Sequence, residues 1–213
     1  MRKHMNKFAM GLLTLTQLAW AVASEEVQTL QAEWAQAMYQ DEGKNKETHL
    51  GKLAEQSRAV VANNPKDADA LIWEGIVLAS YAGKVGGLGA LSLVKEAKAA
   101  FEASIALNPK ALDGSAYTSL GSLYYQVPGW PLGFGDDDKA EEYLKKGLAI
   151  NPNGIDPNYF YGDFLFREGR IQEAEAALNK ALQAPARPGR ESADAGRRKE
   201  IRDLLAKIKT GKS

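Results

Sequence analysis

The sequence offers few residues that could form a catalytic centre. It contains no cysteine, which excludes disulfides, thiolate nucleophiles and zinc–thiolate sites. Of its two histidines, only His49 lies beyond the first 23 residues, at the start of a polar segment, where we expect a solvated side chain in the first turn of a helix. A nucleophile–histidine–acid triad would depend on this one residue. A hydrolase that uses two carboxylates, for instance Asp136 and Asp163, stays open as an alternative.

Two further segments have the composition of ligand sites. Gly83–Gly89 is rich in glycine, as phosphate-binding loops are, but it lacks the closing Gly-Lys-Ser/Thr order and no strand precedes it. We therefore expect a flexible turn there. Asp136–Asp138 offers the oxygen ligands that calcium prefers, but three consecutive carboxylates cannot surround one ion without distant donors. We predict that they cap the next helix, so the sequence indicates no metal and no cofactor.

The first 23 residues have the pattern of a secretory signal. Basic residues at positions 2–7 precede a mostly apolar run at 8–20, too short to span a bilayer, and Ala21–Ala23 is a small-x-small cleavage pattern. An uncleaved amphipathic helix is the alternative. Cleavage near Ala23 would remove three of the 27 Lys and Arg residues and none of the 27 Asp and Glu residues, leaving 24 against 27, a net charge of −3. We expect a periplasmic protein with no membrane span after cleavage and no nucleic-acid partner.

The elements that would position these residues are helices. Apolar residues recur at helical spacing, and Asn-Pro pairs or glycines separate the segments. We expect a helix pair in residues 24–66, three further pairs in 67–186, and a linker with a last helix in 187–213, apolar on one face and charged on the other, which covers the end of the array. Two oversized turns, Gly83–Leu91 and Val127–Gly135, interrupt an otherwise regular period.

Three of the predicted pairs share a signature with a period of about 34 residues. Each has a glycine in an aromatic or aliphatic segment, then an alanine, a Phe or Leu four positions later, and a proline. The matching residues are Gly75, Ala97, Phe101 and Pro109; Gly121, Ala140, Leu144 and Pro152; and Gly162, Ala174, Leu178 and Pro185. Glycine and alanine let two helices approach closely, while the bulky residues fill the space between pairs. The signature is therefore structural, and a repeat scaffold favours binding over chemistry.

These units resemble the tetratricopeptide repeat family. The resemblance implies an all-α solenoid of helical hairpins, with three to four repeats and a C-terminal capping helix. It also implies a protein or peptide partner rather than an enzymatic reaction. In that family the first helix of each pair lines a concave groove, which here implies Ile72, Ile76, Thr118, Ser122, Tyr125, Tyr159, Asp163 and Phe166. The alternative for Tyr125, Tyr159 and Phe166 is packing against the next repeat.

The insert at 127–135 carries two aromatic residues, Trp130 and Phe134, among glycines and prolines. Exposed aromatics on such a loop would suit a partner-binding or ligand-covering role. The alternative is that both rings fold back onto the solenoid.

An exported repeat protein with such inserts also resembles the T-component of TRAP transporter systems. The resemblance uses the architecture, the expected location and the segment Tyr124-Tyr125…Pro128-Gly129, whereas the missing lipid-anchor cysteine departs from the lipoprotein members. It implies self-association and a periplasmic solute-binding protein as partner. It supplies an alternative function, an auxiliary part of a solute uptake system. Neither the ligand, the oligomeric state, the process served nor the status of residues 24–66 as a true repeat follows from the sequence.

Overall fold

The computed structural model describes residues 24–211, so the predicted signal at 1–23 lies outside the described residues. Within 24–211 the chain forms α-helices, one short 3-10 helix and no strand, which confirms the all-α prediction. The elements are α1 (Glu25–Tyr39), α2 (Gly43–Asn63), α3 (Ala68–Val85), α4 (Gly87–Leu107), η1 (Ala111–Gly114), α5 (Ser115–Gln126), α6 (Asp137–Ile150), α7 (Ile155–Arg167), α8 (Ile171–Leu182) and α9 (Glu191–Thr210). No helix in this range is long and apolar enough to cross a membrane.

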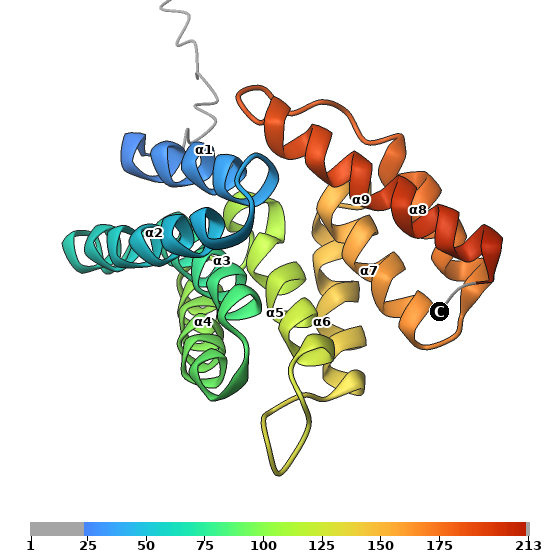
Figure 1. The fold of residues 1–213 in the computed structure, drawn as a ribbon, viewed down its shortest axis with the longest axis horizontal. Helices are drawn as coiled ribbons and strands as arrows, with labels where there is room; N and C mark the ends of the chain where they lie inside the picture. Colours follow the sequence, from blue (N-terminus) through green and yellow to red (C-terminus); the bar gives the residue numbers. More distant parts are fainter. Residues whose placement is uncertain (1–23, 212–213) are drawn as a thin grey trace, which may run out of the picture.

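The helices are arranged as a curved stack of hairpins (Figure 1). The most extensive contacts join α3 to α4, α5 to α6 and α7 to α8, which are the three predicted pairs. The first helices of these pairs also contact each other in order, α3 with α5 and α5 with α7. At the N-terminal end α1 packs on α2 and on α3. The solenoid predicted from the repeat signature is therefore confirmed.

The signature residues meet one another across each hairpin. A Cβ added at Gly75 would lie 2.5 Å from the Phe101 ring, and one at Gly121 would lie 2.8 Å from the Leu144 side chain and 2.9 Å from its backbone nitrogen. A Cβ at Gly162 would lie 2.8 Å from Leu178. Each glycine therefore leaves the space that the bulky residue of the second helix occupies, as the spacing predicts.

The prediction of an oversized turn at Gly83–Leu91 is wrong. Helix α3 continues to Val85 and α4 begins at Gly87, so the extra residues lengthen both helices, to 18 and 21 residues. The alanines and leucines of this segment favour helix strongly enough to offset Gly83 and Gly89. Only the two glycines at the junction need the left-handed region, with φ values of 66° at Gly86 and 59° at Gly87.

The second insert is a loop, as predicted, and it leaves the body of the protein between α5 and α6 (Figure 1). Its base is closed by the Gly135 N–H, which donates to the Pro128 carbonyl at 3.0 Å. The two aromatics of the loop behave differently. The Phe134 ring packs edge-on against Tyr124, with 5.6 Å between centroids, while Trp130 is 90% exposed. Phe134 thus follows the fold-back alternative and Trp130 does not.

The structure also tests two local predictions. Asp136 is the N-cap of α6, and its carboxylate accepts a hydrogen bond from the Lys139 backbone N–H at 3.0 Å, which confirms the capping prediction. The prediction of a solvated first-turn His49 is wrong. Helix α2 begins at Gly43, which places His49 in the second turn, half-buried, with its Nδ1 atom 2.6 Å from a carboxylate oxygen of Asp41.

Candidate functional site

The last helix reaches back to the first. Helix α9 packs on α8 and α7, as a capping helix does, and it also contacts α1 (Figure 1). The ring of Tyr39, the last residue of α1, lies where a Cβ on Gly196 of α9 would be. Next to this contact the Gln40 side-chain amide donates to the Ser192 hydroxyl at 3.3 Å. The first and last helices of the described chain therefore meet.

With this contact the predicted groove becomes a partly open cavity of about 970 Å³. Side chains of α1, α3, α5, α7 and α9 line most of it, so every layer of the stack contributes to one site. Ligand sites in proteins are concave and have volumes of roughly 300–1,000 Å³. The cavity is therefore the candidate functional site.

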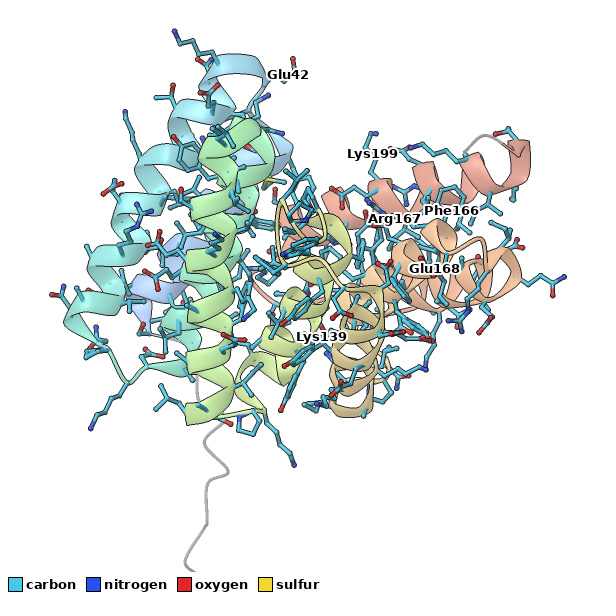
Figure 2. The ribbon with its side chains drawn as sticks, turned by 90° about the horizontal axis from the view of Figure 1, so that it is seen from below. Glu42, Lys139, Phe166, Arg167, Glu168 and Lys199 are labelled. Carbon is cyan, nitrogen blue, oxygen red and sulfur yellow. The ribbon has the colours of Figure 1, made fainter. Side chains whose placement is uncertain are left out.

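The structure brings five of the eight predicted groove residues to the cavity wall: Ile76, Thr118, Ser122, Tyr159 and Asp163. The prediction for Ile72 is wrong, because this side chain is 0% exposed and belongs to the core. Tyr125 and Phe166 do not line the cavity either and follow the packing alternative. Phe166 packs on the core and lies beside Arg167 and Glu168 at the end of α7 (Figure 2).

Tyr125 joins two repeats. Its hydroxyl donates to a carboxylate oxygen of Asp163 at 2.8 Å, and its ring lies 5.7 Å from that of Phe164. The same Asp163 oxygen accepts from Arg167 at 3.3 Å. Burial, followed by the charge of Asp163, raises the pKa of Tyr125 well above its usual value, so the phenol stays protonated as a donor. Tyr125 thus orients Asp163, which itself faces the cavity.

One wall of the cavity is aromatic. Trp34 packs edge-on against both Trp73 and Tyr39, with ring centroids 5.7 and 5.8 Å apart. The Trp34 indole N–H donates to the Ser80 hydroxyl at 2.8 Å. Large, rigid rings such as these offer contact area at a low cost in conformational entropy.

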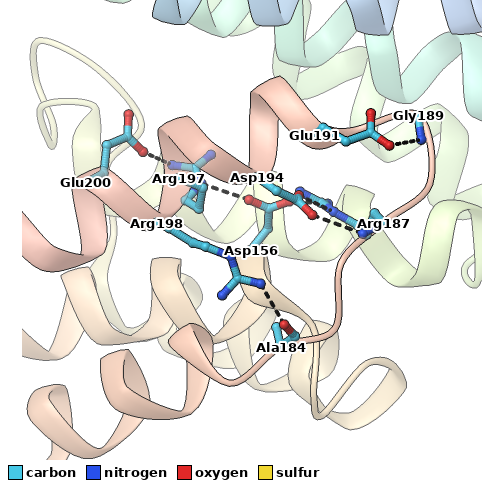
Figure 3. A network of polar contacts seen from close by, with 9 residues as sticks. All are labelled: Asp156, Ala184, Arg187, Gly189, Glu191, Asp194, Arg197, Arg198 and Glu200. Atoms are coloured by element: carbon cyan, nitrogen blue, oxygen red, sulfur yellow. Dashed lines mark hydrogen bonds and ion pairs between the residues drawn. The ribbon is translucent and has the colours of Figure 1, made fainter.

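Another part of the cavity wall carries a network of arginines and carboxylates (Figure 3). Asp156 accepts hydrogen bonds from Arg187 at 2.7 Å and from Arg197 at 2.8 Å. Arg187 also bonds Asp194, and Arg197 also bonds Glu200, each at 2.6 Å. Burial raises the pKa of Asp156, but the charges of Arg197 and Arg187 outweigh that effect and bring it down to about 2.

The same network fixes α9 on its neighbours. Asp156 belongs to α7, so its bonds to Arg197 join α7 to α9. The Arg197 guanidinium also stacks on Tyr159 and Phe160 of α7, 4.4 and 4.6 Å from their ring centroids. Arg198 donates to the carbonyls of Leu182 and Ala184 at the end of α8, at 2.5 and 2.7 Å. These carbonyls have no partner within their own helix, so Arg198 caps it.

A left-handed turn carries two more residues to the cavity. Leu112 and Asp113, within η1, have φ values of 43° and 56°, and both line the cavity. Residues other than glycine rarely adopt positive φ, and such strained positions cluster at functional sites. The turn ends at Gly114, where φ is 75° and a Cβ would lie 2.9 Å from Ile150.

The carboxylate pair considered for a hydrolase is not assembled. Asp163 faces the cavity, but Asp136 caps α6 and is absent from the lining. The other buried cavity acids, Asp156 and Glu200, are paired with arginines. Among residues 24–211 no group of three or more His, Cys, Asp or Glu side chains is placed to hold a metal ion.

Sequence reasoning missed the arginines of the cavity. Residues 187–213 read as a linker and a last helix with one charged face, which gives Arg187, Arg190 and Arg197 no predicted role. Arg197 is in fact buried, against Asp156. Its position between apolar Ala193 and Ile201 on one helical stripe is a signal that could have revealed this.

Comparison with known proteins agrees with this architecture. Residues 132–189 match the family model described as tetratricopeptide repeat. Among solved structures, a thermophilic tetratricopeptide repeat protein of Thermus thermophilus is similar, with a TM-score of 0.58 and 18% identity over 77% of this chain and 76% of that chain. No curated protein matches the sequence. The chain therefore has the tetratricopeptide repeat fold, and its residues 132–189 match the repeat family in sequence as well.

Proposed function

We propose that this protein is a periplasmic binding scaffold that takes part of a protein partner, such as a peptide segment, into its central cavity. The observation that carries the proposal is the cavity itself, closed by α9 and lined by side chains from every layer of the stack. The fold supports an interaction scaffold in general, since tetratricopeptide repeats are typically non-enzymatic binding modules.

The lining supports a ligand with both apolar and polar groups. The aromatic wall of Trp34 and Trp73 would contact apolar groups, while Ser122 and Asp163 would accept or donate hydrogen bonds. Pockets that combine an apolar surface with a few placed polar groups bind and orient ligands in this way.

The test is partner capture from a periplasmic extract with the purified protein as bait. Tyr159→Ala removes a ring from the cavity wall and should reduce the amount of the specific partner recovered. Tyr161→Phe is the matched control, because it removes a hydroxyl that bonds Glu141, and Tyr161 is absent from the cavity lining. Equal recovery by the wild type and Tyr159→Ala, with both proteins folded by circular dichroism, would refute the cavity as the binding site.

Location is a separate part of the proposal. It is supported by the signal pattern at 1–23. Fractionation of cells that express the full chain with a C-terminal tag should place the processed protein, shortened by about the length of a signal peptide, in the osmotic-shock fraction. An unprocessed protein that stays in the cytoplasm would remove the periplasmic assignment.

A second candidate is an auxiliary, T-component-like role in TRAP-type solute uptake. The cavity favours it, because a concave site of about 970 Å³ is large enough to hold a small solute. A TRAP-type permease gene beside the gene for this chain would support it, and so would binding of the encoded solute-binding protein. A genome without any such permease would eliminate it.

A further inference from the structure

One cavity arginine differs from the others. Arg167, Arg187 and Arg197 each form an ion pair with an aspartate. The Arg190 guanidinium forms no ion pair and no hydrogen bond with any residue in 24–211, and its Nη1 atom is buried without an acceptor. A buried donor without an acceptor costs free energy, so such a group in a native protein needs an explanation.

Arg190 rests on a second donor without an acceptor. Its guanidinium carbon lies 4.7 Å from the centre of the Trp73 ring. Trp73 is only 4% exposed, and its indole Nε1 atom is buried with no partner among the described residues. Arg190 and Trp73 both line the cavity, and together they bring unsatisfied N–H groups to one corner of it.

The nearby carboxylates are already engaged. Asp156 binds Arg187 through one oxygen and Arg197 through the other. Asp194 accepts from the Arg187 side chain through one oxygen and from the Arg187 backbone N–H through the other. Burial and then the charge of Arg187 lower the pKa of Arg190, and the charges of Asp156 and Asp194 offset these two effects only in part. The whole lining has six Lys and Arg side chains against four Asp and Glu side chains.

We propose that Arg190, together with the Trp73 indole N–H, binds the carboxylate of a ligand that enters the cavity. One guanidinium without a partner matches one negative charge, and guanidinium–carboxylate hydrogen bonds are among the strongest in proteins. The aromatic wall beside it, with Trp34, would hold the apolar body of the same ligand. This inference depends on the proposed function, because it assumes that the cavity is the binding site.

Binding would move the arginine. In the structure Arg190 Nη1 and Trp73 Nε1 are both hidden from solvent, and the guanidinium lies over the Trp73 ring. A carboxylate can therefore reach both atoms only if the guanidinium slides off the ring. The cation–π contact with Trp73 holds the guanidinium in place, and such a contact is weak compared with a charge-assisted hydrogen bond. A change in Trp73 fluorescence should therefore accompany binding.

The experiment measures the binding of two acids and their amides to the full chain by calorimetry and tryptophan fluorescence. The probes are 3-phenylpropionate with 3-phenylpropionamide, and the tripeptide Ala-Ala-Phe with its C-terminal amide. We expect at least one acid to bind roughly tenfold to a hundredfold more tightly than its amide. Preference in the peptide pair assigns the carboxylate to a chain terminus, and preference only in the first pair assigns it to a free organic acid.

Two variants and a matched control locate the site. Arg190→Gln should bind acid and amide equally, and Trp73→Phe should weaken acid binding and abolish the fluorescence change. Trp34→Phe removes an indole N–H whose partner is Ser80. Because Trp34 would contact the apolar body that acid and amide share, this variant should change the binding of both alike and keep the preference for the acid. Equal binding of acid and amide by the wild type would overturn the proposal even if a variant fails to fold. Preference retained in folded Arg190→Gln would overturn it as well.

The outcomes separate this inference from the proposed function. If Tyr159→Ala loses partner capture while the wild type does not prefer acids, the cavity binds a partner and the carboxylate site is wrong. If the wild type prefers acids while Tyr159→Ala captures its partner normally, the carboxylate site stands and the partner binds elsewhere.

Discussion

The ring of Tyr39 in α1 occupies the position that a Cβ on Gly196 of α9 would take. These residues lie at opposite ends of the repeat array, and their contact closes the cavity. Burial is the largest influence on the Tyr39 phenol and raises its pKa above the usual value. The closure is therefore a packed contact rather than a surface encounter.

Gly196→Ala should weaken this closure. Because a Cβ there overlaps the Tyr39 ring, α1 and α9 must separate or Tyr39 must turn aside, at a cost of about 1–3 kcal/mol in the free energy of unfolding. Gly83→Ala is the matched control. A Cβ at Gly83 meets nothing within 4 Å, and alanine favours helix α3, so this variant should gain roughly 0.5–1 kcal/mol. Urea unfolding would measure the stability of both variants. A loss of stability in Gly83→Ala as well would mean that the loss in Gly196→Ala does not come from the contact with Tyr39.

Gly121→Ala should destabilise the protein, because Gly121 is the signature glycine at the close contact between α5 and α6. The added Cβ would lie 2.9 Å from the Leu144 backbone nitrogen and 3.1 Å from the Ala140 carbonyl oxygen, and backbone atoms cannot turn aside as a side chain can. We expect a loss of about 2 kcal/mol or more in the free energy of unfolding, because α5 and α6 must move apart. Gly89→Ala, where a Cβ comes no closer than 3.4 Å to Val85, should cost far less in the same thermal or urea measurement.

Asp156 should make the free energy of unfolding depend on pH. Its pKa falls from the ordinary 3.8 to about 2 in the folded protein, so the stabilisation is present above about pH 4 and is lost as the pH falls through 2. Although 29% of the side chain is accessible, that surface faces the cavity. We expect Asp156→Asn to lose about 2 kcal/mol at pH 7 and much less near pH 2.

Urea unfolding of the wild type and Asp156→Asn at pH 7, 4 and 2 would measure this effect. Glu173→Gln is the control, because that carboxylate pairs with Arg170 on the exposed surface and should change the free energy of unfolding little. A difference between wild type and Asp156→Asn that stays constant from pH 7 to 2 would show that the carboxylate charge is not the cause.

The two aromatic residues of the loop should contribute differently to the free energy of unfolding. Phe134→Ala removes the edge-on contact with Tyr124 and a cation–π contact with Lys98, and should cost about 1–2 kcal/mol. Trp130→Ala removes a side chain that is 90% exposed and should stay within about 0.5 kcal/mol of the wild type. Differential scanning calorimetry would compare them, and equal losses would mean that Trp130 also packs on the body.

The helix pairs could be predicted from the sequence because their signals are local or periodic. Gly75 and Phe101 lie on neighbouring helices, and the same pairing of a glycine with a bulky residue recurs at Gly121 with Leu144 and at Gly162 with Leu178. The error at Gly83–Leu91 came from treating glycines as breaks, although the surrounding residues favour helix and nothing packs on the hairpin tip to oppose it.

The closure and the arginine wall could not be predicted in this way. Tyr39 and Gly196 form one contact between distant segments, and no repeated pattern in the sequence indicates it. The helical stripe that Arg197 shares with Ala193 and Ile201 indicates its burial, but the sequence does not indicate its partner, because Asp156 lies on another helix. The resemblance to the tetratricopeptide repeat implied the five groove residues that line the cavity. The repeats stop before α9, which supplies Arg197 to the same cavity.

The contact between α1 and α9 has a consequence for how this chain can change in length. An open solenoid can gain or lose a unit by duplication or deletion, because each unit needs only its neighbours. Here an added hairpin between α1 and α9 would move Gly196 away from Tyr39. A hairpin inserted between α7 and α9 would also separate Asp156 from Arg197. The number of units is therefore fixed by geometry, and this lineage of repeats can diversify by substitution but not by extension.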